Sequence, residues 1–141
     1  MLRSSELDQL KAVPLFASFN KRDLRRLAKA SDEVDIRPGY VIVEEGQSGH
    51  GFYLILEGRA TVRRNNRKLA TLGPGQYFGE LALLDRGPRN ATVVADNQMR
   101  LLVIGPREFG GVIDEVPTLA RKLLTSMAQR LREADARSIS H

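Results

Sequence analysis

The sequence predicts a mainly β fold, a sandwich or barrel of short strands, with helices before and after it. From about residue 33 to residue 104, short apolar runs alternate with glycine, asparagine and aspartate. Many short strands with turn signals at this spacing are typical of sandwiches and barrels. Both flanking regions instead carry apolar residues at helical spacing. The chain has 141 residues, of which 42% are apolar. This length suits one domain, and the composition is sufficient for a hydrophobic core.

The N-terminal region is expected to form two helices. Residues Ser5 to Lys11 indicate a short first helix. A second helix is expected to start at Asn20, because Asn20 can cap it and Asp23 lies at the capping-box position. Phe19 can pack on Leu24 as the hydrophobic staple that accompanies such a start. We therefore assign residues 1–31 to helices.

The central region is expected to contain strands joined by tight turns. Six apolar runs predict them: Tyr40–Glu44, Phe52–Leu56, Ala60–Arg63, Lys68–Leu72, Ala91–Ala95 and Met99–Ile104. Asn65 and Asn66 can adopt the positive φ angles of a two-residue hairpin turn. Asp96 and Asn97 mark another turn. We assign residues 32–104 to the barrel.

The C-terminal region is again helical. Pro106 suits the first turn of one helix, and Pro117 suits the start of a longer one. Apolar residues recur at helical spacing along it: Val116, Leu119, Ala120, Leu123, Leu124, Met127 and Leu131. This stripe fits either packing against the barrel or a dimer seam. The polar tail from Ala134 is expected to fray. We therefore place the C-terminal helices at residues 105–133 of a single domain, 1–141.

The segment from Phe78 to Val94 indicates an anion-binding site. Residues 79–84 can form one or two helical turns, whose first backbone N–H groups have no internal partner and attract a phosphate. Gly79 lacks a Cβ and so permits close approach to the backbone. Pro88 fixes the chain just before Arg89, whose guanidinium can meet two phosphate oxygens at once.

Glu80 adds a second requirement to this site, because a carboxylate repels a phosphate. The conflict disappears if Glu80 accepts a hydrogen bond from a ligand hydroxyl. A ribose that carries a cyclic phosphate supplies both groups. The alternative is a structural turn in which Glu80 pairs with Arg89.

Two motifs resemble the cyclic nucleotide-binding domain family. Gly-Glu-Leu-Ala-Leu-Leu, a short spacer and Pro-Arg-x-Ala-Thr-Val resemble its phosphate-binding cassette, which is found in the protein kinase A regulatory subunit, the catabolite activator protein and nucleotide-gated channels. Glu-Gly-x-x-x-x-x-Phe-Tyr-Leu-Ile-Leu-Glu-Gly resembles the central hairpins of its barrel. The resemblance implies an eight-stranded jelly-roll barrel (a double-stranded β-helix), a cassette at residues 78–92, and cAMP or cGMP as the ligand with no further cofactor.

By the same resemblance, Glu80 holds the ribose 2′-hydroxyl, while Arg89 and the backbone of Gly79 to Ala82 hold the cyclic phosphate. The implied ligand-binding residues are Phe78, Gly79, Glu80, Leu81, Ala82, Arg89, Asn90 and Ala91. Asn90 replaces the alanine, serine or threonine of many relatives, and it can contact the ligand or cap local backbone. It therefore leaves the choice between cAMP and cGMP open.

The base of the nucleotide is expected to lie beside the barrel and the last helix. The resemblance implies that this base pocket is lined by Val62, Leu69, Ala70 and Arg130. Arg130 matches an arginine that contacts the nucleotide in the catabolite activator protein, although a solvated charge is an equal alternative. Ala134 and Asp135 replace polar residues that reach adenine there.

The function expected from these features is a stand-alone cyclic nucleotide receptor, not an enzyme. Movement of the last helix is expected to signal binding to an unknown partner protein. One alternative is a degenerate barrel module that has lost its ligand and acts as an interaction protein. A cupin-like metal enzyme needs clustered ligands, but the chain has no cysteine and two histidines, His50 and His141.

Partners and location follow as further expectations. The net charge of +5 is scattered, which favours a solvated surface over a nucleic-acid site. No DNA-binding domain is expected after the long helix, and a monomer or weak homodimer is expected. The first twenty residues lack a long apolar run, so no secretory signal is expected. No run approaches the ~20 apolar residues of a membrane helix, so we expect no membrane segment and a cytoplasmic location.

Overall fold

The computed structural model describes residues 4–47, 51–79 and 88–139, and within them the side chains of all but residues 4, 130 and 137–139. The chain forms two compact units. Met1–Lys29 and Gly110–His141 make one, which we call the helical unit. Ala30–Phe109 makes the other, the β unit. The single domain expected from the sequence stays a prediction.

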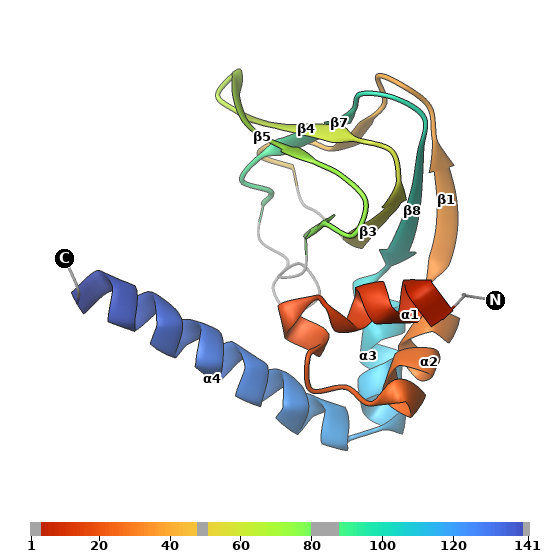
Figure 1. The fold of residues 1–141 in the computed structure, drawn as a ribbon, viewed down its shortest axis with the longest axis vertical. Helices are drawn as coiled ribbons and strands as arrows, with labels where there is room; N and C mark the ends of the chain where they lie inside the picture. The colour runs from red at the N-terminus through yellow and green to blue at the C-terminus, as the bar shows by residue number, and fades with distance from the viewer. Residues whose placement is uncertain (1–3, 48–50, 80–87, 140–141) are drawn as a thin grey trace. The chain divides into compact units, whose positions relative to one another are not determined.

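The β unit is a jelly-roll barrel of two antiparallel sheets (Figure 1). Its described strands are β1 (Asp32–Ile36), β2 (Val41–Val43), β3 (Phe52–Glu57), β4 (Ala60–Arg64), β5 (Arg67–Leu72), β6 (Tyr77–Phe78), β7 (Thr92–Ala95) and β8 (Met99–Ile104). One sheet has the order β1-β8-β3-β6 and the other has the order β2-β7-β4-β5. The predicted mainly β fold with helices at both ends is confirmed.

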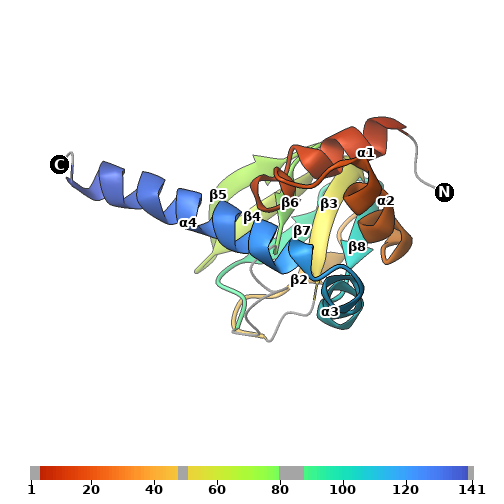
Figure 2. The ribbon, with the colours of Figure 1, turned by 90° about the horizontal axis from the view of Figure 1, so that it is seen from below.

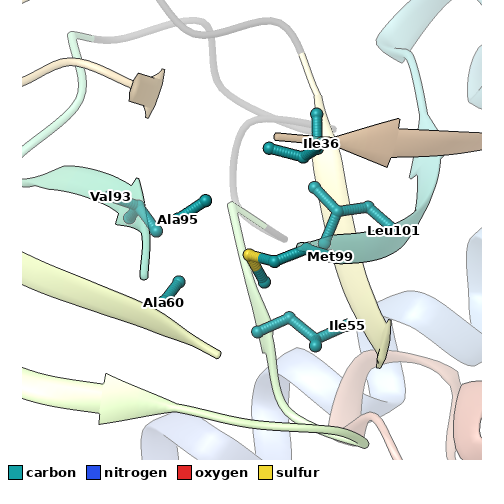
Figure 3. Close-up of a cluster of buried hydrophobic side chains, with 7 residues drawn as sticks. All are labelled: Ile36, Ile55, Ala60, Val93, Ala95, Met99 and Leu101. Atoms are coloured by element: carbon teal, nitrogen blue, oxygen red, sulfur yellow. The ribbon is translucent and has the colours of Figure 1, made fainter. Parts of the chain in front are cut away.

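The core of the β unit lies between its two sheets (Figure 3). Ile55, Met99 and Leu101 come from the first sheet, and Ala60 and Val93 come from the second. All five are at most 3% exposed. Burial of each large side chain contributes about 1.5–3 kcal/mol. The small side chain of Ala60 leaves room for the larger ones opposite, so the sheets can pack closely.

The turn between β3 and β4 depends on a glycine. Gly58 has a φ of +95°, and a Cβ there would lie 2.6 Å from the Gln98 carbonyl oxygen and 2.7 Å from Met99 Cγ. Both the backbone conformation and the packing therefore require a residue without a side chain at this position. The predicted turn at Asn65 and Asn66 is also confirmed, since their φ angles are 52° and 65°.

The helical unit contains α1 (Ser4–Lys11), the 3-10 helix η1 (Pro14–Phe16), α2 (Lys21–Lys29) and α4 (Thr118–Ile139), while α3 (Pro106–Glu115) contributes to both units. The predicted capping box is confirmed. Asp23 N–H donates to Asn20 Oδ1 over 2.9 Å, and Asn20 N–H donates to Asp23 Oδ2 over 3.1 Å. These bonds satisfy donors that would otherwise be unpaired at the start of α2.

The last helix differs from the prediction in its length. α4 continues to Ile139 instead of ending near residue 133, and Figure 2 shows it as one continuous helix. Its final turns contain alanine, arginine and glutamate, which favour a helix even without burial. The apolar stripe is divided, because Leu119 and Leu123 are buried whereas Leu124 and Leu131 are 66% and 69% exposed. Within the helical unit, α4 packs against η1.

Candidate functional site

The backbone of Arg89 is held beside the segment that follows β2. Gly46 N–H donates to the Arg89 carbonyl over 2.8 Å, and Arg89 N–H donates to the Gln47 carbonyl over 2.8 Å. Pro88, one residue earlier, restricts the chain further because its ring fixes φ. The position from which the Arg89 side chain departs is therefore defined by two hydrogen bonds and a proline.

The guanidinium of Arg89 is partly buried against uncharged groups. Its Nη2 donates to the carbonyl of Gly51 over 2.6 Å. Its central carbon lies 5.9 Å from the ring centre of Tyr53, within range of a cation–π interaction. Its Nε is buried and has no hydrogen-bond partner among the described residues. The positive charge thus has a neutral carbonyl and an aromatic ring as its described neighbours.

Gly79 is fitted to this arginine. Its φ is +81°, and a Cβ built on it would lie 2.5 Å from Arg89 Nη1 and 2.5 Å from the Gly51 carbonyl oxygen. We expected Gly79 to let a ligand approach the backbone. In the structure, its missing side chain leaves the space that the guanidinium and the carbonyl occupy, while the approach of a ligand stays a prediction. Any larger residue must displace one of them.

Tyr53 and Phe78 form the aromatic wall of the site. Their rings stack with centres 4.8 Å apart, and β3 and β6 pair these two residues directly. Sequence reasoning did not include Tyr53 or the Gly51 carbonyl among the site residues. Their contacts with Arg89 arise from the fold and not from a local sequence pattern. The pairing of Phe78 with Tyr53 also left little signal, because β6 has two residues.

Burial shifts the pKa values of Arg89 and Tyr53, the two ionisable groups at the centre of the site. Burial lowers the pKa of Arg89, and the nearby Tyr53 opposes that shift. Burial raises the pKa of Tyr53, and the positive charge of Arg89 opposes that shift. The lowered pKa means that the surroundings disfavour the charged form of Arg89. An anion placed here would offset that cost.

Asn90 connects the site to the β4–β5 hairpin. Arg64 Nε donates to the Asn90 carbonyl over 2.8 Å. Asn65 N–H donates to Glu45 Oε1 over 3.0 Å, and Glu45 N–H donates to Thr92 Oγ1 over 2.9 Å. The side chain of Asn90 is exposed. Its role as a ligand contact stays a prediction, as does that of Ala91.

Several predicted site residues fall outside the described part of the chain. Glu80, Leu81 and Ala82 do, and with them the cassette helix and the alternative pairing of Glu80 with Arg89. The side chain of Arg130 is likewise not described. Their assigned roles stay predictions.

The predicted base pocket is described at three positions on β4 and β5. Val62 is partly buried and packs against the core between the sheets. Ala70 lies opposite Val62 and is exposed. The register then passes from the Val62–Ala70 pair to the Arg63–Lys68 pair, so Leu69 has no partner and forms a β-bulge. Leu69 is 51% exposed. That these three residues contact the base of a nucleotide stays a prediction.

Two further observations concern other site types. No three histidine, aspartate or glutamate residues in the described ranges are grouped so that they could hold a metal ion. In the same part of the chain, no helix combines the length and apolar character needed to cross a bilayer.

The arrangement around Arg89 is that of a site for an anion. A partly buried arginine is favourable when paired with an oxyanion, and its planar fork matches a phosphate. A phosphate diester meets this requirement, and the aromatic wall of Tyr53 and Phe78 adds an apolar surface. The described geometry therefore supports a phosphate-containing ligand at this end of the barrel.

Comparisons with known proteins identify the family. Residues 33–115 match the model of the cyclic nucleotide-binding domain. The chain is 32% identical over 113 residues to a cAMP-dependent protein kinase regulatory subunit of Hypocrea atroviridis, with 80% of this chain and 24% of that protein covered. It is 36% identical over 121 residues to the cyclic AMP receptor protein of Thermus thermophilus, with 75% and 56% covered.

A solved structure agrees with this assignment. The N-terminal domain of a transcriptional regulator from Streptomyces coelicolor superposes with a TM-score of 0.86 at 32% identity, covering 93% of this chain and 95% of that one. The chain belongs to the cyclic nucleotide-binding domain family. It spans between about a quarter and about half of the length of the two curated relatives.

Proposed function

We propose that the chain binds a cyclic nucleotide, cAMP or cGMP, and that Arg89 holds its cyclic phosphate. The observation that carries the proposal is the partly buried guanidinium whose described neighbours are uncharged. The names of the relatives, a regulatory subunit and a receptor protein, support cAMP signalling as the context. Glu80 completes the site in this proposal by accepting a hydrogen bond from the ribose 2′-hydroxyl.

The proposed ligand supplies what the site lacks. Its phosphate diester is negatively charged across the physiological pH range and offsets the cost of burying Arg89. Hydrogen bonds to charged groups contribute roughly 1.5–3 kcal/mol each. Three or four of them, with partial burial of the base, are sufficient for the ~8 kcal/mol of micromolar affinity. The ring stack of Tyr53 and Phe78 provides apolar surface close to the phosphate site.

We also propose that the chain is a receptor and not an enzyme, and that α4 transmits binding to a partner protein. The long helix carries Leu124 and Leu131 in exposed positions, where they are available to a partner. A ligand transmits a signal only if it favours one position of such an element over another. Stand-alone action and the expected cytoplasmic location stay predictions.

One titration series tests these proposals. We expect cAMP or cGMP to bind the whole chain with micromolar affinity by calorimetry, and Arg89→Ala to weaken binding about tenfold to hundredfold, a loss of ~1.4–3 kcal/mol. Arg59→Ala is the matched control, because it removes an exposed arginine that pairs with Asp96 at another place on the barrel. Unchanged affinity in Arg89→Ala contradicts the assigned role. Hydrogen exchange in α4, measured in the same samples, is expected to change on binding.

A further inference from the structure

The tip of the β4–β5 hairpin carries four cations in directly opposed pairs. Arg63 lies opposite Lys68, and Arg64 lies opposite Arg67. All four are exposed, and none forms an ion pair with a described residue. The sequence contains no acidic residue between Glu57 and Glu80. We call these four residues the basic hairpin.

This arrangement is unfavourable for folding by itself. Like charges directly across an antiparallel ladder destabilise the strand pair. The cyclic nucleotide site described above uses Arg64 only as a donor to the Asn90 carbonyl and does not use the other three cations. The carboxylate of Glu45 accepts from Asn65 N–H beside the turn, but it forms no ion pair with any of the four cations. A cost of this kind indicates a surface that becomes stable when an anionic partner covers it.

The strand that carries half of the basic hairpin also has a free edge. β5 is the last strand of its sheet, and no described segment pairs with its outer side. All of its residues from Arg67 to Thr71 are exposed. Leu69 projects from the bulge beside Lys68 and is 51% exposed. An extended peptide can add to such an edge through main-chain hydrogen bonds.

From this geometry we infer that the basic hairpin docks an acidic, extended segment of a partner protein, which adds as a strand along β5. Successive side chains of a strand point to opposite faces. The Arg63–Lys68 pair and the neighbouring Arg64–Arg67 pair therefore lie on opposite faces of the hairpin. An added strand alternates in the same way, so its carboxylates reach both faces, while an apolar residue between them covers Leu69.

Other anionic partners fit this surface less well. A membrane or a DNA duplex presents one anionic surface and so meets mainly the cations of one face. Single-stranded nucleic acid is usually bound by aromatic side chains on which the bases stack. The segment from Ala60 to Leu72 contains no aromatic residue. Neither kind of partner uses the free backbone edge of β5.

The test uses the whole chain without nucleotide and three labelled peptides. The first peptide repeats glutamate-glutamate-valine, so that neighbouring glutamates point to opposite faces of an added strand. The second replaces glutamate with glutamine, and the third is the acidic peptide with a central proline. Duplex DNA and phosphatidylserine vesicles are measured beside them. We expect the acidic peptide to bind more tightly than the others, with an affinity that falls as salt increases. Proline should weaken binding because it cannot continue the ladder.

Two matched triple variants each remove three positive charges, one from the basic hairpin and the other from α2. Arg63→Gln, Arg67→Gln and Lys68→Gln together neutralise the basic hairpin but retain Arg64. Lys21→Gln, Arg22→Gln and Arg25→Gln together remove the same charge from exposed positions of α2. We expect the hairpin variant to bind the acidic peptide about tenfold more weakly, and the α2 variant to bind it as the wild type does.

Four results overturn the inference: equal affinity of the acidic peptide for both variants, equal affinity of the acidic and glutamine peptides, no effect of proline, or binding of DNA or vesicles in place of the acidic peptide. If the hairpin variant fails to fold, the three peptides on the wild-type chain decide. Because no nucleotide is present, failure here is separate from failure of the cyclic nucleotide proposal.

Discussion

Two cationic sites of the β unit, Arg89 and the basic hairpin, present their charges in contrasting ways. Arg89 is alone, partly buried, and held by two backbone hydrogen bonds and a neighbouring proline. The basic hairpin has four cations, all of them exposed and three of them without a hydrogen bond from the side chain to a described residue. Arg89 therefore has its position defined in advance, whereas the basic hairpin has a high local charge on exposed side chains.

This difference determines what each group can recognise. A charge in partly buried surroundings interacts strongly, because little water screens it, and its fixed orientation selects one ligand geometry. Exposed charges contribute about 0–1 kcal/mol per pair, and salt reduces that contribution further. Arg89 is therefore suited to a small ligand, while the basic hairpin needs several contacts and a polypeptide-sized partner.

The largest effect is expected from the residue that makes room for Arg89. Gly79→Ala should lower the free energy of unfolding by about 2–3 kcal/mol, because its positive φ costs about 1–2 kcal/mol in any other residue and the new Cβ displaces the guanidinium or the Gly51 carbonyl. Urea unfolding measures the change.

A double-mutant cycle separates the two causes of that loss. In an Arg89→Ala background, the close contact with Nη1 is absent, so Gly79→Ala should cost less than in the wild type. An equal cost in both backgrounds would mean that backbone conformation and the Gly51 carbonyl alone explain the loss. Gly39→Ala is the matched control for conformation, because Gly39 also has a positive φ but no heavy atom within 4 Å of a Cβ.

A smaller effect with the opposite sign is expected when the buried charge itself is removed. The lowered pKa of Arg89 indicates that burial disfavours its charged form. Arg89→Met, which keeps an apolar stem of similar length, should therefore raise the free energy of unfolding of the ligand-free chain by about 0.5–1 kcal/mol. The same variant should lose cyclic nucleotide affinity. Reduced stability would show that the Gly51 hydrogen bond and the Tyr53 contact outweigh the cost of the charge.

Local signals in the sequence were sufficient for most of the fold. The capping box at Asn20 and the positive φ angles at Asn65 depend on neighbouring residues only, and both are confirmed. β1 was not among the predicted strands, since it has two apolar residues among three acidic ones. β6 was missed because it has two residues and is defined by its pairing with β3.

The candidate site was predictable only in part, and the roles of its residues stay predictions. The sequence indicated Gly79 and Arg89 because their residue types have specific chemistry. It did not indicate the Gly51 carbonyl, because a backbone acceptor has no residue type of its own, nor Tyr53, whose position beside Arg89 results from the fold. The bulge at Leu69 was likewise not predictable, because it arises from the register between β4 and β5.

The smallest effect is expected for a substitution in the exposed basic hairpin. Lys68→Glu converts the Arg63–Lys68 pair from a repulsive to an attractive one and should raise the free energy of unfolding by about 0.2–1 kcal/mol. Thermal unfolding at low salt measures the gain, which should shrink as ionic strength increases. Lys68→Gln is the control and should give a smaller gain, because it removes repulsion without adding attraction. If Lys68→Glu is no more stable than Lys68→Gln, the opposed cations do not interact in the free chain, and the cost that led us to expect an anionic partner is absent.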